Sequence, residues 1–161
     1  MRLELAPDIG KRLRAALREA KHREIGGMLF AEQLAPSHFR IMDFSVDANS
    51  GTHTNFRREP ARHRAALDEF FARTGYDFSR FNYLGEWHSH PSFAVRPSLE
   101  DLTTMTELIE YPEISFAVLL IVRLRFWFWT DYSLTLFARG HPPRPIGLTR
   151  RCVRIPSELS S

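Results

Sequence analysis

The sequence predicts an α/β fold in which helices flank a central mixed β-sheet. Segments whose apolar residues recur at helical spacing alternate along the chain with segments rich in β-formers. The most apolar segment, ISFAVLLIV at residues 114–122, does not alternate apolar with polar residues, which is typical of a strand covered on both faces. At 161 residues the chain has the length of one domain, so these segments are expected to share a core.

The first part of the chain is expected to contain a helix followed by two extended segments. Residues 8–22 are predicted to be helical because Pro7 and Asp8 suit a helix start and apolar residues follow at helical spacing. The segment EIGGMLF is predicted to be extended. Residues 38–46 (HFRIMDFSV) are rich in β-formers, but their apolar positions change phase between Ile41 and Phe44, which indicates a β-bulge. A polar loop follows.

The middle of the chain adds two helices and one strand. The segment ARHRAALDEFFART, after Pro60, is predicted to form a helix that ends near Gly75. FNYLGEWH is predicted to be a strand. A third helix is expected from Pro97 and Ser98 to about Glu110, because the sequence Tyr-Pro that follows would stop it.

The last part of the chain is dominated by β-formers. After the strand at residues 114–122, the segment RFWFWTDYSLTLFAR supplies one long strand or two shorter ones. Its four aromatic residues, 126–129, are interpreted as sheet packing in preference to an interaction surface, because large aromatics commonly alternate on strands. We expect residues 1–140 to form the domain and residues 141–161 to form a C-terminal tail with at most one edge strand.

The composition argues against several classes of protein. The chain has 22 Lys and Arg against 19 Asp and Glu, but its arginines are scattered and form no basic stripe, so no nucleic-acid partner is expected. A single cysteine, Cys152, excludes an intrachain disulfide framework and fits a reducing compartment. No apolar signal segment opens the chain, and its longest apolar run is too short to span a membrane. We therefore expect a cytoplasmic protein without a membrane partner.

Two histidines lie one residue apart at the end of the predicted strand FNYLGEWH. Side chains at positions i and i+2 of a strand share a face, so His88 and His90 can present two imidazole nitrogens to one metal ion. Asp101, in the first turn of the next helix, can add a carboxylate. Three protein ligands with one open position are typical of a catalytic zinc site. His88, His90 and Asp101 are therefore candidate ligands of a Zn²⁺ site.

The same residues also have structural interpretations. Histidines near a strand end are often surface groups or hydrogen-bonded groups. Ser98 and Asp101 form the pattern S-x-x-D ahead of an apolar run, which is typical of a helix capping box. The two interpretations are compatible for Ser98, which can cap the helix while it lies beside the metal.

The complete spacing is more specific than its parts. His88-x-His90, seven residues, Ser98, two residues and Asp101 resemble the H-x-H-x7-S-x2-D signature of the JAB1/MPN/Mov34 (JAMM) metalloprotease family. The flanking segments agree: GEWHSHP is similar to the family's G-x-x-H-S-H-P, and REIGGMLF is similar to an upstream element in which a glutamate opens a strand. The resemblance covers roughly residues 8–138 and implies the JAMM/MPN architecture, which is similar to that of cytidine deaminases.

The resemblance implies a role for each matching residue. His88, His90 and Asp101 would hold Zn²⁺, and Glu24 would act as general base on a water molecule. Ser98 would donate a hydrogen bond to the oxyanion. General acid–base groups typically contribute about 10²–10⁴ in rate, and oxyanion donors about 10²–10³.

Two alternatives concern the general base and its chemistry. Glu86 precedes His88 by two residues on the same strand face, so strand geometry alone nominates it, whereas the resemblance favours Glu24. His22 and Glu24 form H-x-E, half of a zinc deaminase signature. The other half, P-C-x-x-C, is missing because Cys152 has no partner, so nucleobase deamination is set aside.

The resemblance also implies a substrate class. Family members with the complete motif cleave peptide or isopeptide bonds, most often after the C-terminal tail of ubiquitin or a ubiquitin-like protein. We therefore expect a ubiquitin-like protein and its conjugates as partners. The short chain resembles stand-alone bacterial JAB proteins encoded beside E1-like and E2-like proteins in antiphage defence operons. The alternatives are a JAMM peptidase that acts on a sulfur-carrier protein or short peptides, and a non-catalytic MPN scaffold, although scaffolds typically lose zinc ligands and none is lost here.

Overall fold

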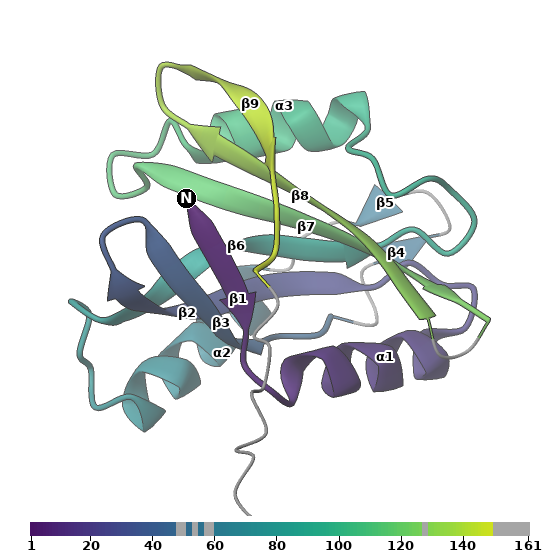
Figure 1. Cartoon of the computed structure of the whole chain (residues 1–161), viewed down its shortest axis with the longest axis horizontal. Helices are drawn as coiled ribbons and strands as arrows, with labels where there is room; N and C mark the ends of the chain where they lie inside the picture. Colours follow the sequence, from purple (N-terminus) through teal and green to yellow (C-terminus); the bar gives the residue numbers. More distant parts are fainter. Residues whose placement is uncertain (48–50, 53–54, 57–59, 127–128, 150–161) are drawn as a thin grey trace, which may run out of the picture.

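The computed structural model describes residues 1–47, 51–52, 55–56, 60–126 and 129–149, which form a mixed β-sheet with helices on both faces (Figure 1). Within these residues the main sheet has seven strands in the order β1-β3-β2-β6-β7-β8-β9. The pairs β1/β3 and β6/β7 are parallel and the other neighbours are antiparallel. The strands are β1 (Arg2–Leu5), β2 (Gly26–Ala35), β3 (His38–Phe44), β6 (Phe81–Ser89), β7 (Phe116–Arg125), β8 (Trp129–Ala138) and β9 (His141–Ile146), and the short strands β4 (Gly51–Thr52) and β5 (Asn55–Phe56) pair separately.

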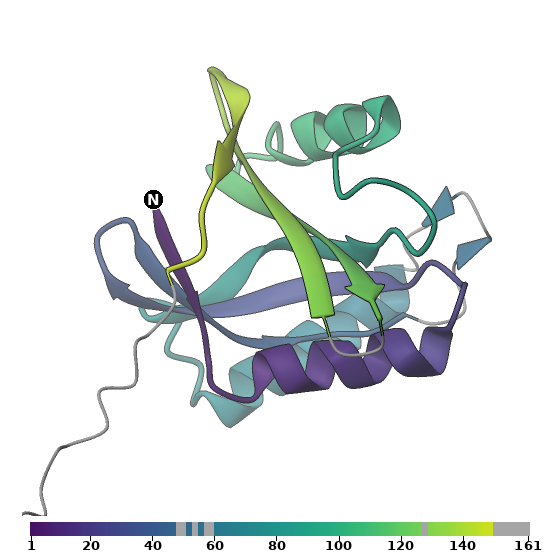
Figure 2. The ribbon, with the colours of Figure 1, turned by 45° about the vertical axis from the view of Figure 1, so that its right-hand side comes forward.

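The helices divide the core into two layers. Helix α1 (Ile9–Ala20) packs against β3 and β7 on one face of the sheet, and Figures 1 and 2 show α2 (Pro60–Arg73) and α3 (Leu99–Leu108) on the other. Residues of β7 alternate between the layers: Leu120 packs in the α1 cluster and Ile121 in the α3 cluster. This alternation explains the unbroken apolar sequence of residues 116–122 in β7, because a strand segment covered on both faces needs apolar residues at every position.

The connection from β6 to β7 places the site. These two strands are parallel, and α3 lies in the crossover between them. After the carboxyl end of β6, the chain forms a loop, enters α3 at its amino end, and then continues into β7. Side chains at the end of β6 and in the first turn of α3 are brought together by this single β–α unit.

Two glycines allow β2 to approach its neighbours closely. A Cβ atom on Gly26 would lie 2.9 Å from the Cβ of His88 and would collide with the carbonyl oxygen of Trp87. A Cβ atom on Gly27 would lie 2.7 Å from Oγ of Ser45. The Gly-Gly pair is therefore required where the start of β2 lies between the end of β6 and the segment after β3.

Most predicted elements are confirmed, with shifted ends. All three helices form, and the predicted strands correspond to β2, β3, β6, β7, β8 and the edge strand β9. The predicted bulge is also present: Phe30 pairs with Asp43 and Ala31 with Ile41, so Met42 is the extra residue on β3. Strand β1 was not predicted. It is only four residues long, too short for its period to be recognised, and it is fixed by parallel pairing with β3.

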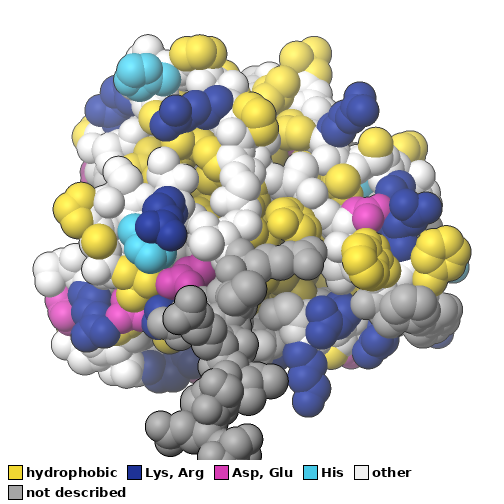
Figure 3. Space-filling model, viewed as in Figure 1, with side chains coloured by type: hydrophobic (Ala, Val, Ile, Leu, Met, Phe, Trp, Pro, Cys, Tyr) yellow, Lys and Arg dark blue, Asp and Glu magenta, His cyan; other side chains and the backbone are white. Residues whose placement is uncertain are grey.

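The interpretation of the aromatic run as sheet packing is wrong for the residues that the structure describes. Phe126 is 71% exposed and has a φ of +50°, and Trp129 is 57% exposed, because the chain turns here between β7 and β8. Residues 127–128 lie outside the described residues. Figure 3 shows hydrophobic side chains on the surface at the end of this hairpin, at the right of the molecule.

The tail returns to the start of the chain. After β9, Leu148 forms a parallel bridge with Leu3, and the N–H of Thr149 donates to the carbonyl of Leu3 at 2.6 Å. Leu148 also packs against the α1 cluster. No helix among the described residues is long and apolar enough to cross a membrane.

Candidate metal centre

The end of β6 brings two imidazole rings together. His88 pairs with Gly26 of β2 and Ile121 of β7, and the N–H of His90 donates to the carbonyl of Val122 at 2.9 Å. Both histidines are buried, and their Nε2 atoms lie 3.0 Å apart. The predicted sharing of one strand face is therefore confirmed.

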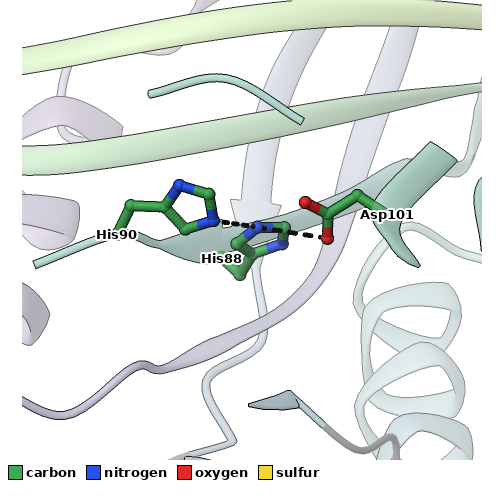
Figure 4. Close-up of side chains that lie close together, drawn as sticks. All are labelled: His88, His90 and Asp101. Carbon is green, nitrogen blue, oxygen red and sulfur yellow. Dashed lines mark hydrogen bonds and ion pairs between the residues drawn. The ribbon is translucent and has the colours of Figure 1, made fainter. Parts of the chain in front are cut away.

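Asp101 completes a group of three potential ligands. In Figure 4 its carboxylate faces His88, with Oδ1 3.5 Å from Nε2 of His88. One ligand atom from each of His88, His90 and Asp101 lies within 4.8 Å of the others. Ligand atoms placed at about 2.0–2.1 Å around a tetrahedral ion are separated by roughly 3.3 Å. The separations of 3.0 Å between the two Nε2 atoms and 3.5 Å between His88 and Asp101 are close to this value.

The helix cap and the metal site use different oxygens of the same carboxylate. Oδ2 of Asp101 accepts hydrogen bonds from the backbone N–H of Ser98 at 2.7 Å and from its Oγ at 2.8 Å, and Oγ of Ser98 accepts from the N–H of Asp101 at 3.1 Å. This is a complete capping box. Oδ1 remains directed toward His88. The capping interpretation and the ligand interpretation are therefore both consistent with the structure.

The two histidines are held in the form that binds metal. Nδ1 of His90 lies 2.8 Å from the carbonyl oxygen of Ala94, so Nδ1 carries the hydrogen and Nε2 offers its lone pair. The pKa of His88 is lowered to about 4, mainly by burial. The nearby charge of Asp101 raises this pKa, and His90 lowers it further. His88 is therefore neutral at pH 7. Two imidazole nitrogens and a carboxylate that lie close together form a donor set suited to Zn²⁺.

Glu24 lies two residues before β2, the strand that pairs with the end of β6. The register that pairs Gly26 with His88 continues beyond β2, because the N–H of Ser89 donates to the carbonyl of Ile25 at 2.8 Å and the N–H of Ile25 donates to Oγ of Ser89 at 3.0 Å. One step further along this register places Glu24 opposite His90. Directly opposed residues share a face of the sheet, and Glu24 is buried. Its backbone position therefore suits a group that serves the site.

The alternatives Glu86 and His22 lie elsewhere. Glu86 shares the strand face of His88, but its Oε1 lies 3.4 Å from the hydroxyl of Tyr83, and it lines a separate cavity of about 1170 Å³ whose walls include residues of α2 and the end of α3. His22 is exposed in the turn after α1 and lines a smaller pocket. Neither belongs to the group of three ligands.

Two contributions were not found from the sequence. The carbonyl of Ala94 carries no signal in the sequence, because any residue could supply it. Ser89 lies inside the H-S-H motif, but the hydrogen bond that its Oγ accepts from the N–H of Ile25 depends on strand pairing between distant parts of the chain.

Comparison with known proteins agrees with this fold. A family model described as prokaryotic homologs of the JAB domain matches residues 7–132. The solution structure of protein DSY2949 from Desulfitobacterium hafniense is similar, with a TM-score of 0.66 and 18% identity over 91% of each chain. The solution structure of a protein from Salinibacter ruber has a TM-score of 0.60 and 20% identity over 94% of this chain and 93% of that one. At these identities the two structures support the fold alone. The comparison with curated proteins found no match.

Proposed function

Because the chain belongs to the prokaryotic homologs of the JAB domain, we propose that it is a cytoplasmic zinc-dependent peptidase. Its substrate would be the peptide or isopeptide bond that follows the C-terminal tail of a ubiquitin-like protein. The observation that carries the proposal is the convergence of His88, His90 and Asp101 on one point, with the buried Glu24 two residues before the adjacent strand β2. When bound, Zn²⁺ would supply Lewis acidity, which lowers the pKa of a water molecule and polarises the scissile carbonyl.

Glu24 is the proposed general base. Its carboxylate would take a proton from the attacking water while the water oxygen bonds to the carbonyl carbon. The same proton would then pass to the leaving amine as the carbon–nitrogen bond breaks. The two hydrogen bonds between Ile25 and Ser89, one of them accepted by Oγ of Ser89, hold this segment against β6 and so fix the backbone of Glu24 relative to His90.

Ser98 is the proposed donor to the oxyanion, and the structure adds a condition to this role. Its single hydroxyl hydrogen donates to Oδ2 of Asp101 and can serve only one acceptor at a time. Ser98 would therefore rotate away from Asp101 when substrate is bound. The backbone N–H of Ser98 continues to hold the carboxylate during this rotation, so the ligand stays in place.

The substrate tail would bind in an extended form beside a strand edge. Figures 1 and 2 place the β4–β5 ladder near the loop that joins β6 to α3, at the end of β6 where the site lies. Backbone hydrogen bonds to such an edge can bind a glycine-rich tail without large side-chain pockets. E1-like and E2-like proteins of an antiphage conjugation pathway are the partners that this proposal expects.

A cleavage assay tests the proposal against its alternatives. The ubiquitin-like protein encoded beside this chain is fused to a C-terminal extension or conjugated to a lysine, and products are measured by mass spectrometry with and without chelator. Chelator-sensitive release immediately after the tail is expected. Turnover of short unrelated peptides without cleavage of any ubiquitin-like fusion would favour the general peptidase. Tight binding of the fusion without turnover of any substrate would favour the scaffold.

A further inference from the structure

The loop that leaves β6 is held by the side chain of Arg123. The pairing of β6 with β7 ends with Ser89 and Val122, whereas β7 continues, so Arg123 lies beside the start of this loop. Its Nη1 donates to the carbonyl of Phe93 at 3.0 Å, and its Nη2 donates to Oδ2 of Asp131 on β8 at 2.9 Å. One guanidinium therefore ties the loop to β7 and β8.

The carbonyl that Arg123 holds is next to the carbonyl that orients His90. Nδ1 of His90 lies 2.8 Å from the carbonyl oxygen of Ala94. In Figure 4, Nε2 of His90 faces His88, and Nδ1 lies on the opposite side of the ring. The two backbone torsions of Ala94 separate its carbonyl from that of Phe93, because the peptide bond between the two residues is planar. A fixed Phe93 carbonyl therefore restricts the direction of the Ala94 carbonyl.

The backbone of His90 is held by the same strand. Its N–H donates to the carbonyl of Val122, the residue before Arg123, at 2.9 Å. β7 therefore fixes His90 in two ways, directly through its main chain and indirectly through the loop carbonyl that meets its ring. Hydrogen bonds to the second nitrogen of a metal-ligating histidine set its tautomer and its orientation.

Arg123 is kept in this place at a cost. Its Nε is buried and has no hydrogen-bond partner, which is unfavourable. The ion pair with Asp131 does not need this burial, since Arg125, two residues further along the same face of β7, lies 3.6 Å from Asp131 with half of its side chain exposed. The contact between Arg123 and the loop accounts for the burial better than the ion pair does.

We propose that Arg123, oriented by Asp131, is a positioning residue for the metal centre. By holding the carbonyl of Phe93, it keeps the carbonyl of Ala94 on Nδ1 of His90. The lone pair of Nε2 is then directed to the point where the metal binds. This inference rests on the metal centre of the proposed function, but not on the substrate or on cleavage.

The tautomer of His90 in the metal-free protein tests the proposal without a cleavage assay. The side-chain ¹⁵N signals of His90 are measured by NMR in mildly alkaline buffer, and in the wild type Nδ1 should carry the hydrogen. In Arg123→Met the ring should be a mixture of both tautomers, because the Ala94 carbonyl is no longer fixed, and its two nitrogen signals should move toward each other. Unchanged His90 signals in this variant would overturn the proposal.

Arg125→Met is the matched control. It removes the same charge from the same face of β7, and Arg125 contacts Asp131 and the ring of Phe126 instead of the loop. The His90 signals should remain as in the wild type. An equal change in both variants would show that the charge on the strand, and not the contact with Phe93, governs the ring, and would overturn the proposal.

Zinc affinity, measured by competition with a chromophoric chelator, supplies a second readout. Outer hydrogen-bond partners of ligating histidines commonly contribute about 10–100-fold to metal affinity. Arg123→Met should therefore bind Zn²⁺ about tenfold more weakly than Arg125→Met, or worse. Equal affinities of the two variants would contradict the positioning role.

The part played by Asp131 is tested by combining substitutions. Asp131→Asn should weaken zinc binding less than Arg123→Met, because the guanidinium remains. The variant Arg123→Met/Asp131→Asn should bind zinc no more weakly than Arg123→Met alone, because Asp131 acts through Arg123. An additive loss in the combined variant would exclude this route.

Arg123→Lys allows the test even if Arg123→Met does not fold. Lysine retains the charge and can pair with Asp131, but its ammonium group lacks the planar fork with which arginine reaches two acceptors. Urea unfolding should show a free energy near that of the wild type, while the His90 signals remain altered. Wild-type His90 signals in Arg123→Lys would mean that the ion pair is sufficient. Altered tautomers and weakened zinc binding, in a protein whose wild type cleaves no substrate, would leave the positioning role standing and remove the proposed function.

Discussion

Oδ1 of Asp101 lies 3.5 Å from Nε2 of His88, while the other oxygen of the same carboxylate is held by the N-cap of α3. A carboxylate restrained in this way loses little further freedom when a metal ion binds. The capping box therefore restrains the carboxylate of Asp101 in the candidate metal centre.

The first prediction concerns metal content. Purified protein should contain one zinc ion per chain by elemental analysis, and His88→Ala/His90→Ala should lose it because two of three protein ligands are removed. The matched control is His22→Ala/His141→Ala, which removes two exposed histidines outside this group and should keep the zinc. Stoichiometric zinc in the first variant would exclude this site.

The second prediction separates the two candidate bases. Glu24→Gln should keep the zinc and the fold but lower the cleavage rate by about 10²–10⁴, because it removes proton transfer and leaves the ligands intact. Glu86→Gln is the control, since Glu86 faces Tyr83 and the larger cavity. A large loss of rate in Glu86→Gln, with an active Glu24→Gln, would reverse the assignment.

The third prediction concerns the double role of Ser98. Ser98→Ala should lower the free energy of unfolding of the metal-free protein by about 0.5–2 kcal/mol through loss of the helix cap. It should also lower the cleavage rate of the zinc-loaded protein by about 10²–10³. Ser98→Gly should largely restore stability, because glycine is tolerated at the N-cap, and should not restore the rate. If Ser98→Gly restored both the stability and the cleavage rate, Ser98 would act only as a helix cap.

The fourth prediction is a pH dependence of the metal-free protein. Burial lowers the pKa of His88 to about 4 from an unfolded value of 6.5. Between these two values the unfolded chain binds a proton that the folded chain does not, so stability should fall as the pH is lowered through this range. Urea unfolding of chelated protein from pH 7 to 4 measures the slope. The slope should be shallower in His88→Gln, and identical slopes in both proteins would contradict the prediction.

The fifth prediction concerns a contact between the two helix layers. Asp43 accepts from Arg12 of α1 at 2.5 Å and also from Arg73 of α2. Burial raises the pKa of Asp43, but these hydrogen bonds outweigh it and lower the pKa below 3.8. Asp43→Asn should therefore lower the free energy of unfolding at pH 7 by about 1–2 kcal/mol, measured by urea unfolding.

The exposed ion pair between Arg12 and Asp8 supplies the control for Asp43→Asn. Asp8 lies 3.4 Å from Arg12 at the surface, so Asp8→Asn should change the free energy of unfolding by less than about 0.5 kcal/mol. The effect of Asp43→Asn should also disappear in acid, below the pKa of Asp43, where the wild-type carboxyl is neutral as well. Equal effects of the two substitutions would mean that the contact between the helices adds nothing to stability.

The metal ligands could be predicted because they are local. His88, His90 and Asp101 belong to one β–α unit, so the period of a strand and the start of a helix were enough to bring them together. Glu24 required the family resemblance, because its approach to His90 depends on pairing between β2 and β6, which are far apart in sequence.

Other features followed from tertiary packing that the sequence does not encode locally. The four consecutive aromatics after Arg125 have the composition of a strand, but the chain turns at Phe126 and leaves its ring exposed. Strand β1 is too short for its period to be informative and forms because β3 offers an edge. The carbonyl of Ala94, which orients His90, depends on the path of the loop alone.

The location of the metal ion is the most direct test of the site. Crystals of zinc-loaded protein, measured at the zinc absorption edge, should show one anomalous peak at about 2.0–2.1 Å from Nε2 of both His88 and His90 and about 2.0–2.2 Å from Oδ1 of Asp101. A peak bound by other residues, or zinc-soaked crystals without a peak between these three side chains, would contradict the metal centre described here.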